Sequence, residues 1–189
     1  MWHPAHTLRC FKIGSGFMEM NAHSVTVEEQ PISPRALRDV LGQFATGVTV
    51  ISTLGDNDAP VGLTANSFAS VSLDPPLVAW SLSRQAPSYS AFQNHKAFAI
   101  NILCDQSMDL ALKFARPAPD KFADVDWFGG VDGVPLLRVA ATTIECQTES
   151  RIPAGDHEIY VGRVINFHQT DKPPLVFYKG KFTSLGDLT

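Results

Sequence analysis

The sequence predicts a mainly β protein whose antiparallel strands form a closed or nearly closed barrel, with a few short helices at its periphery. Two observations carry this prediction. Short runs rich in β-branched and aromatic residues follow one another from residue 48 onward, and only brief helical patterns interrupt them. A doubly wound sheet would need a helix after almost every strand, whereas an antiparallel barrel does not.

The first regular element is predicted to be a helix. Ser33 is placed as its N-cap, and Pro34 follows at the first helical position, where a missing N–H costs nothing. Apolar residues then recur at helical spacing as far as Phe44. The other predicted elements are helices near 87–94 and 105–115, and strands at 48–53, 66–73, 77–82, 98–103, 142–149 and 158–167.

Turn residues separate several of these strands. Residues 55–58, Gly-Asp-Asn-Asp, predict a hairpin after the first strand. Residues 74–76, Asp-Pro-Pro, predict an extended bend, because each proline fixes φ and removes a hydrogen-bond donor. Residues 116–135 form the longest irregular stretch and are a candidate lid.

Length and composition indicate one domain. A chain of 189 residues with 44% apolar residues can bury one sizeable core but is short for two domains with a linker. Residues 1–25 show no hydrophobic period, so we expect an N-terminal extension there and a single barrel domain over 26–189.

Charge and cysteine content narrow the partners and the compartment. A formal charge of −4 gives no basic field for nucleic acid or an anionic membrane surface. No apolar run approaches the roughly 18 residues of a membrane helix. Three cysteines far apart in the sequence suggest neither a disulfide framework nor a zinc site, so a cytoplasmic location is expected.

The common catalytic motifs are absent from the sequence. Residues 14–16, Gly-Ser-Gly, lack both the third glycine and the preceding strand of a dinucleotide fingerprint. We find no phosphate loop, no nucleophile elbow and no His-Glu-x-x-His motif, and no metal site is predicted.

Small polar residues are frequent between residues 60 and 83. Gly62 allows a close backbone approach, while Thr64, Asn66 and Ser67 offer hydrogen-bonding groups. Such a lining would suit an extended polar ligand. The alternative is that these residues are only the solvent-facing positions of barrel strands.

Seven sequence motifs resemble those of one known family. They are QFATGV (43–48), LTANSF (63–68), SLDPPLV (72–78), FAINIL (98–103), DKF (120–122), GDH (155–157) and PLVFYKG (174–180). In this order they resemble the flavin reductase family of the FMN-binding split barrel. The resemblance implies an antiparallel, Greek-key-like barrel and a homodimer. It also implies an NAD(P)H:flavin oxidoreductase that holds FMN or FAD noncovalently, takes hydride from NADH or NADPH, and supplies reduced flavin to a separate, transiently bound monooxygenase.

The resemblance also implies where the flavin is bound. The implied contacts are Pro60, Val61, Gly62, Leu63, Thr64, Asn66, Ser67, Ser81, Leu82, Ser83, Arg84, Ser88, Lys113 and Phe114. Backbone amides, Asn66 and Ser67 would meet the polar edge of the ring, and hydroxyls with a cation would meet the phosphate. Arg84 and Lys113 are equally well interpreted as solvated surface charges.

The Gly-Asp-His motif is expected at the nicotinamide side of the site. His157 would contact the nicotinamide or the flavin edge, and Asp156 would fix the imidazole tautomer. Alternatively, the pair only caps its own turn. Tyr178 either stacks on a ring or fills the core.

Two other functions fit the same residues. A flavin-binding electron carrier or sensor would hold FMN without turning over NAD(P)H. A structural or partner-binding barrel would bind no flavin at all.

Overall fold

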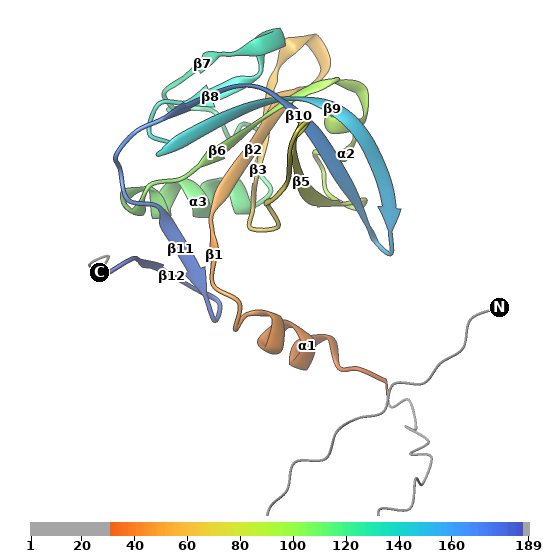
Figure 1. Ribbon diagram of the computed structural model, residues 1–189, viewed down its shortest axis with the longest axis vertical. Coiled ribbons are helices and arrows are strands. Elements are labelled where there is room, and N and C mark those ends of the chain that lie inside the picture. Colours follow the sequence, from red (N-terminus) through yellow and green to blue (C-terminus); the bar gives the residue numbers. More distant parts are fainter. Residues whose placement is uncertain (1–30, 187–189) are drawn as a thin grey trace, which may run out of the picture. The chain divides into compact units, whose positions relative to one another are not determined.

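The computed structural model describes residues 31–186, and Figure 1 shows the order of its elements. The predicted extension at residues 1–25 lies outside the described residues. The fold is mainly β, as the sequence predicted. The helices are α1 (Pro34–Leu41), α2 (Tyr89–Asn94) and α3 (Met108–Ala115), with short 3-10 turns at Asp56–Asp58, Asp105–Ser107 and Val131–Gly133. The strands are β1 (Thr46–Gly47), β2 (Thr49–Leu54), β3 (Pro60–Ala65), β4 (Ala69–Leu73), β5 (Pro76–Ser83), β6 (Ala97–Ile102), β7 (Trp127–Gly129), β8 (Pro135–Leu137), β9 (Thr142–Ala154), β10 (His157–Gln169), β11 (Leu175–Tyr178) and β12 (Lys181–Ser184).

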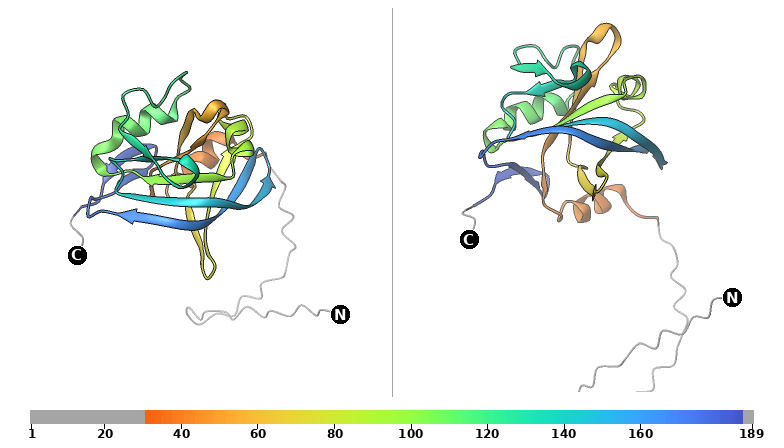
Figure 2. Two further views of the ribbon diagram at one scale, coloured as in Figure 1. Left: turned by 90° about the horizontal axis from the view of Figure 1, so that it is seen from above. Right: turned by 45° about the horizontal axis from the view of Figure 1, so that its top comes forward.

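Seven strands form one antiparallel sheet in the order β3-β2-β6-β9-β10-β5-β4. Its two edges, β3 and β4, are consecutive in the chain and are joined only by residues 66–68. An extended chain advances at most about 3.6 Å per residue, so this link cannot span an open seven-stranded sheet. The sheet must therefore roll up until its edges almost meet, and Figure 2 shows this curvature.

The longest strands, β9 and β10, form a hairpin that lies across the barrel (Figure 1). Gly155 makes its turn with a φ of +61°, a conformation that favours glycine. Both strands continue beyond the predicted limits, because β10 pairs with β9 on one side and with β5 on the other. This double pairing brings His157 opposite Ser83.

The core has two main parts. Inside the barrel, Trp80 stacks on Tyr160 with 4.8 Å between ring centroids and meets Phe92 of α2 edge-on at 5.0 Å. Pairs of this kind add about 0.5–1.5 kcal/mol beyond the burial of their area. The second part packs Val48 and Val50 against Phe114 of α3. The strand β2 is buried along its whole length, so it has no solvent face.

Several elements differ from the sequence-based expectation. Strands β1, β3, β7, β8, β11 and β12 were not predicted, since most are short and lie next to glycine or proline. The strand predicted at 66–73 begins only at Ala69, because residues 66–68 form the link from β3. The N-cap of α1 is confirmed, because the Ser33 hydroxyl accepts from the Ala36 amide at 3.4 Å. In the described part of the chain, no helix is long and apolar enough to span a membrane, and no cluster of His, Cys, Asp and Glu side chains is suited to a metal ion.

Candidate active site

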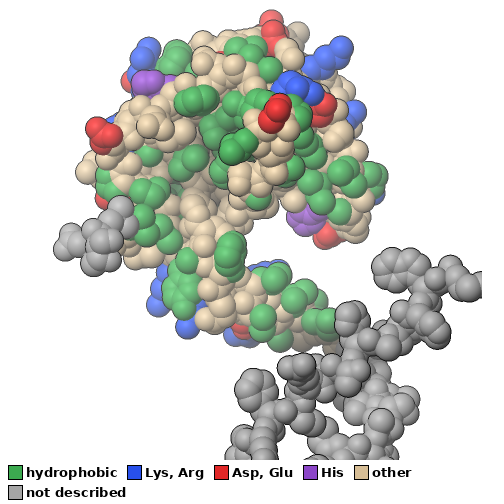
Figure 3. Space-filling view, in the orientation of Figure 1, with side chains coloured by type: hydrophobic (Ala, Val, Ile, Leu, Met, Phe, Trp, Pro, Cys, Tyr) green, Lys and Arg blue, Asp and Glu red, His purple; other side chains and the backbone are tan. Residues whose placement is uncertain are grey.

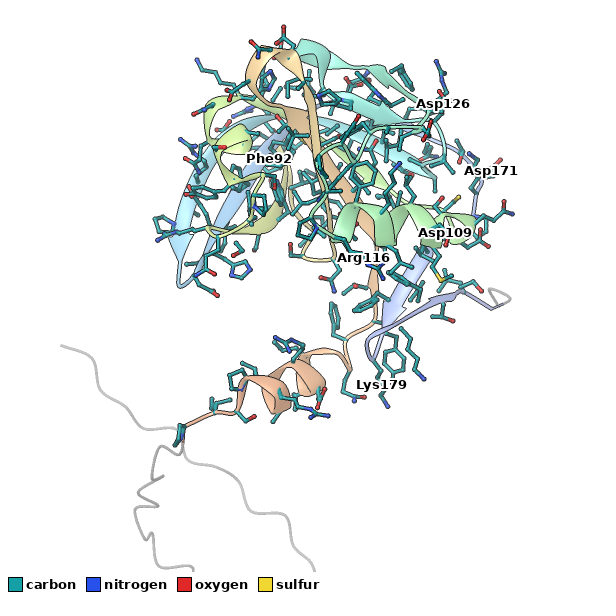
Figure 4. All side chains as sticks on the ribbon, turned by 180° about the vertical axis from the view of Figure 1, so that it is seen from behind. Phe92, Asp109, Arg116, Asp126, Asp171 and Lys179 are labelled. Carbon is teal, nitrogen blue, oxygen red and sulfur yellow. The ribbon has the colours of Figure 1, made fainter. Side chains whose placement is uncertain are left out.

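A cavity of about 610 Å³ opens beside strand β3 and the end of α3. Its volume falls within the roughly 300–1,000 Å³ that small-molecule sites occupy. Figure 4 labels Arg116, the residue that directly follows α3 near this opening. The lining residues are Pro60–Thr64 from β3, Ala86–Ser88 before α2, Phe114 and Ala115 from α3, and Pro117–Pro119 with Lys121 from the segment after α3.

The wall formed by β3 depends on a close approach between backbone and ring. A Cβ added to Gly62 would lie 2.9 Å from the ring of Phe114, which is closer than van der Waals contact allows. The hydroxyl of Thr64 donates to the carbonyl of Ala111 at 2.6 Å. The lack of a side chain at Gly62 lets β3 lie close to α3, and the hydrogen bond of Thr64 holds it there. Residues of β3 also line the cavity.

Lys121 places a cation in the same cavity. Its Nζ donates to the carbonyls of Phe114 at 2.8 Å and Gly62 at 3.3 Å. Within residues 31–186 it forms no ion pair, since no carboxylate lies within 4.0 Å of Nζ. Burial lowers the pKa of Lys121 from its ordinary value. A partly buried ammonium without a counter-ion suits an anionic ligand.

The segment that carries Lys121 is shaped by the preceding residue. The carboxylate of Asp120 accepts from the amides of Phe122 at 2.9 Å and Ala123 at 3.0 Å. From the sequence, Asp120–Phe122 were identified only as a family motif, and Lys121 was not assigned to the site. The residue type was visible in the sequence, but its fixation by carbonyls of β3 and α3 was not.

The structure brings only part of the predicted flavin contacts together in this cavity. Residues Pro60–Thr64, Ser88 and Phe114 line it. Lys113 does not, because its Nζ donates to the carbonyl of Ala123. Arg84 is exposed, and its backbone amide donates to the carbonyl of Asp156 at 3.0 Å. Neither of these two cations, Lys113 and Arg84, lies in the wall of the cavity.

Other predicted contacts gather where the barrel edges meet. The Ser67 hydroxyl accepts from the Ser81 amide at 2.9 Å and donates to the Ser81 carbonyl at 3.2 Å, so it fastens the β3–β4 link to β5. The side chain of Leu82 is buried in the core and leaves only its backbone for a ligand. Ser83 lies opposite His157 across the strand pair.

His157 and Asp156 form the contact that the sequence analysis expected. The Nδ1 of His157 lies 2.7 Å from Oδ1 of Asp156. This hydrogen bond and the charge of the imidazole lower the pKa of Asp156, which keeps its carboxylate ionised. An ionised carboxylate accepts a hydrogen bond from Nδ1–H, so the Nε2 of a neutral imidazole is left as an acceptor.

Asn66 and Tyr178 lie away from the first cavity. Asn66 lines a second cavity of about 500 Å³ between α1, β1 and the β11–β12 hairpin. Tyr178 is 39% exposed, so the alternative that it fills the core is wrong. The Nζ of Lys179, labelled in Figure 4, lies 5.2 Å from the centre of the Tyr178 ring.

These features define an antiparallel barrel with a cavity of cofactor size and an imidazole oriented by a carboxylate. A family model, the flavin reductase like domain, matches residues 41–186. The chain belongs to this family.

Several relatives are similar over most of this chain. A probable flavin reductase of Rhizobium meliloti is 44% identical over 79% of the chain, which spans about half (48%) of that relative's length. The reductase subunit HsaB of a flavin-dependent monooxygenase from Rhodococcus jostii is 38% identical, covering 84% of this chain and 82% of its own. The solved structure of the Streptomyces globisporus NADH:FAD oxidoreductase SgcE6, in complex with NAD and FAD fragments, is 34% identical with a TM-score of 0.77 and covers 83% of this chain and 97% of its own.

Proposed function

We propose that this chain is an NADH-dependent flavin reductase that binds FMN or FAD noncovalently in the first cavity. The observation that carries the proposal is the cavity beside β3, with the ammonium of Lys121 in its wall, which forms no ion pair within residues 31–186. Membership of the flavin reductase like family and the similarity to SgcE6 support the same activity.

The residues present fit a flavin. Lys121 and the hydroxyl of Ser88 would hold its phosphate, since a cation and hydroxyls are the usual partners of phosphate oxygens. Backbone groups of Gly62, Leu63 and Thr64 would follow the ribityl chain along β3. The ring would extend toward the Ser81–Ser83 segment and His157, which lie side by side in the sheet.

His157 is proposed to place the hydride donor. A bound flavin supplies a ring that accepts hydride from reduced nicotinamide, so the chain needs no nucleophile of its own. Asp156 holds the imidazole through Nδ1 and leaves Nε2 to contact the nicotinamide or the edge of the ring. The role of the protein is alignment and exclusion of water.

Steady-state oxidation of NADH and NADPH, measured without oxygen in the presence of FMN, FAD or riboflavin, tests this function. We expect turnover with NADH and at least one of the phosphorylated flavins. Flavin binding without turnover of either nicotinamide would favour the alternative of an electron carrier or sensor. No flavin binding would favour a structural barrel.

We also propose that the chain forms a homodimer. Apolar residues are exposed on α1 and in the link between α1 and β1, with Val40 at 67% and Phe44 at 79%. On strand β4, Leu73 is 95% exposed. Figure 3 shows hydrophobic side chains along α1. Exposed apolar side chains that lie together, as along α1, often mark an interface. Sedimentation at micromolar concentration should show a dimer, and a fully active monomer would contradict it.

The relative HsaB is named as the reductase subunit of a flavin-dependent monooxygenase. We infer that this chain likewise forms one reductase domain over 26–189, acts in the cytoplasm, and passes reduced flavin to a separate monooxygenase. Coupled turnover with a purified oxygenase component tests the transfer.

A further inference from the structure

A buried polar cluster lies on the opposite face of β10 from His157. Glu158 is only 8% exposed, and its carboxylate accepts from the hydroxyl of Tyr89 and from Nε2 of Gln93 at 2.9 Å. Tyr89 and Gln93 are four residues apart on α2, so they share one face of that helix. The carboxylate of Glu158 therefore attaches α2 to β10.

Two further side chains complete this cluster. The Nε2 of Gln93 also donates to the hydroxyl of Tyr160 at 2.8 Å. Arg151 donates to the backbone carbonyl of Gln93 at 3.2 Å, and its Nε lies 3.9 Å from the Glu158 carboxylate. Because a buried carboxylate is tolerated only when it is paired and hydrogen-bonded, these partners restrict Glu158 to one arrangement.

Tyr89 donates to this carboxylate over a wide range of pH. Its hydrogen bond to Glu158, followed by burial, raises the pKa of the Tyr89 hydroxyl above its ordinary value. The hydroxyl therefore keeps its proton, and can donate to Glu158, up to a higher pH than an ordinary tyrosine would.

The cluster is connected to both ends of the proposed site. Helix α2 begins directly after Ser88, and residues 86–88 form one wall of the cavity. The amide of Arg84 donates to the carbonyl of Asp156 at 3.0 Å. The β9–β10 hairpin thus holds the turn before α2 at Asp156 and α2 itself at Glu158, and His157 lies between these two positions in the chain.

We propose that Glu158 is a positioning residue that holds the cavity wall at Ser88 and the imidazole of His157 in a fixed relation. The inference rests on the proposed function, in which Ser88 meets the flavin phosphate and His157 meets the nicotinamide. Glu158 acts through α2 and β10.

A double-mutant cycle between Glu158 and Ser88 tests this role. Glu158→Ala is expected to weaken FMN binding and to lower kcat/KM for NADH at saturating FMN, each by about tenfold. Ser88→Ala should change only FMN affinity, and His157→Ala only kcat/KM. In the Glu158→Ala background, Ser88→Ala should have a much smaller effect on FMN affinity than in the wild type, since the hydroxyl is already displaced.

Matched variants separate positioning from general stability. Glu149→Ala removes an exposed carboxylate of β9 that pairs with Arg163 at 2.8 Å. It should change neither FMN affinity nor kcat/KM for NADH. Glu158→Gln keeps an oxygen that accepts from the Tyr89 hydroxyl. It should therefore retain most of the FMN affinity and most of the kcat/KM for NADH. If Glu158→Ala does not fold, Tyr89→Phe takes its place in the cycle.

Two results would overturn the inference. One is additive effects of the Glu158 and Ser88 substitutions on FMN affinity. The other is a lowered melting temperature of Glu158→Ala with unchanged FMN affinity and NADH kinetics. A wild-type protein that neither binds nor reduces flavin would instead refute the proposed function, so the two failures are distinguishable.

Discussion

Replacement of Lys121 by methionine should weaken the binding of FMN while leaving riboflavin almost unaffected. The two ligands share their ring and ribityl chain and differ only in the phosphate. Methionine keeps much of the apolar stem of lysine but removes the ammonium that lies between the carbonyls of Phe114 and Gly62. The comparison therefore isolates the interaction between that cation and the phosphate.

The size of the effect follows from the geometry of Lys121. Hydrogen bonds to charged groups contribute about 1.5–3 kcal/mol, and Lys121 is only partly buried, so we expect the lower end of this range. A loss of about 1.5 kcal/mol corresponds to roughly tenfold weaker FMN binding. Riboflavin should bind within about twofold of its wild-type affinity, a difference too small to matter on this scale.

Fluorescence titration of both ligands into the wild type, Lys121→Met and Lys113→Met measures these effects. Lys113 is a matched comparison, since its Nζ donates to the carbonyl of Ala123 outside the cavity wall. Thermal melting of each variant shows whether the fold is retained. An equal loss of FMN and riboflavin affinity, or a larger loss of FMN affinity in Lys113→Met, would refute the assignment of the phosphate to Lys121.

The preference for FMN over riboflavin should also decline as the pH rises. The protonated ammonium attracts the phosphate, and this attraction disappears as pH passes the pKa of Lys121. Burial lowers that pKa, so the decline should begin at a lower pH than for an ordinary lysine. Since riboflavin contains the same ring, the ratio of the two affinities cancels titration of the ring, and above about pH 7 the FMN phosphate, with a second pKa of about 6, is already doubly charged. A ratio that is constant up to the ordinary lysine range would contradict the lowered pKa.

Three other outcomes are expected. His157→Ala should leave FMN affinity nearly intact and lower kcat/KM for NADH roughly tenfold, if about 1.4 kcal/mol of transition-state stabilisation is lost; stopped-flow reduction at the wild-type rate would exclude this role. Gly162→Ala should destabilise the barrel by about 1–3 kcal/mol in urea unfolding. The reason is that its new Cβ would lie 2.4 Å from the ring of Phe98 and 3.0 Å from Cβ of Cys146. An unchanged midpoint of urea unfolding would show that β10 shifts freely. Burial raises the pKa of the Cys146 thiol to about 12, so its alkylation at pH 8, followed by peptide mass spectrometry, should occur only on unfolding, and rapid labelling of the folded protein would contradict this.

Six of the seven strands of the barrel sheet were located from runs of apolar and β-branched residues, whereas β3 was not. The residues of β5 and β6 are rich in apolar and β-branched types, and both runs were located to within one or two residues. The short strands β7, β8 and β12 were not predicted, since three or four residues beside glycine or proline carry no period. Their pairing depends on neighbours far away in the chain.

The site was only partly predictable for the same reason. The motif at Gly155–His157 suggested both the turn and the Asp156–His157 contact, because these residues are adjacent. The place of Lys121 depends on carbonyls of two distant elements, and that of Glu158 on side chains of α2. Sequence patterns report local spacing, whereas these residues gain their roles from the closure of the barrel.

The most direct test of the central claim is anaerobic stopped-flow mixing of the FMN-loaded protein with NADH. The absorbance of oxidised flavin should disappear in a single turnover, at a rate that saturates with NADH concentration, and His157→Ala should slow this step. Flavin that is bound by the protein and reduced by dithionite, but stays oxidised with saturating NADH, would contradict it.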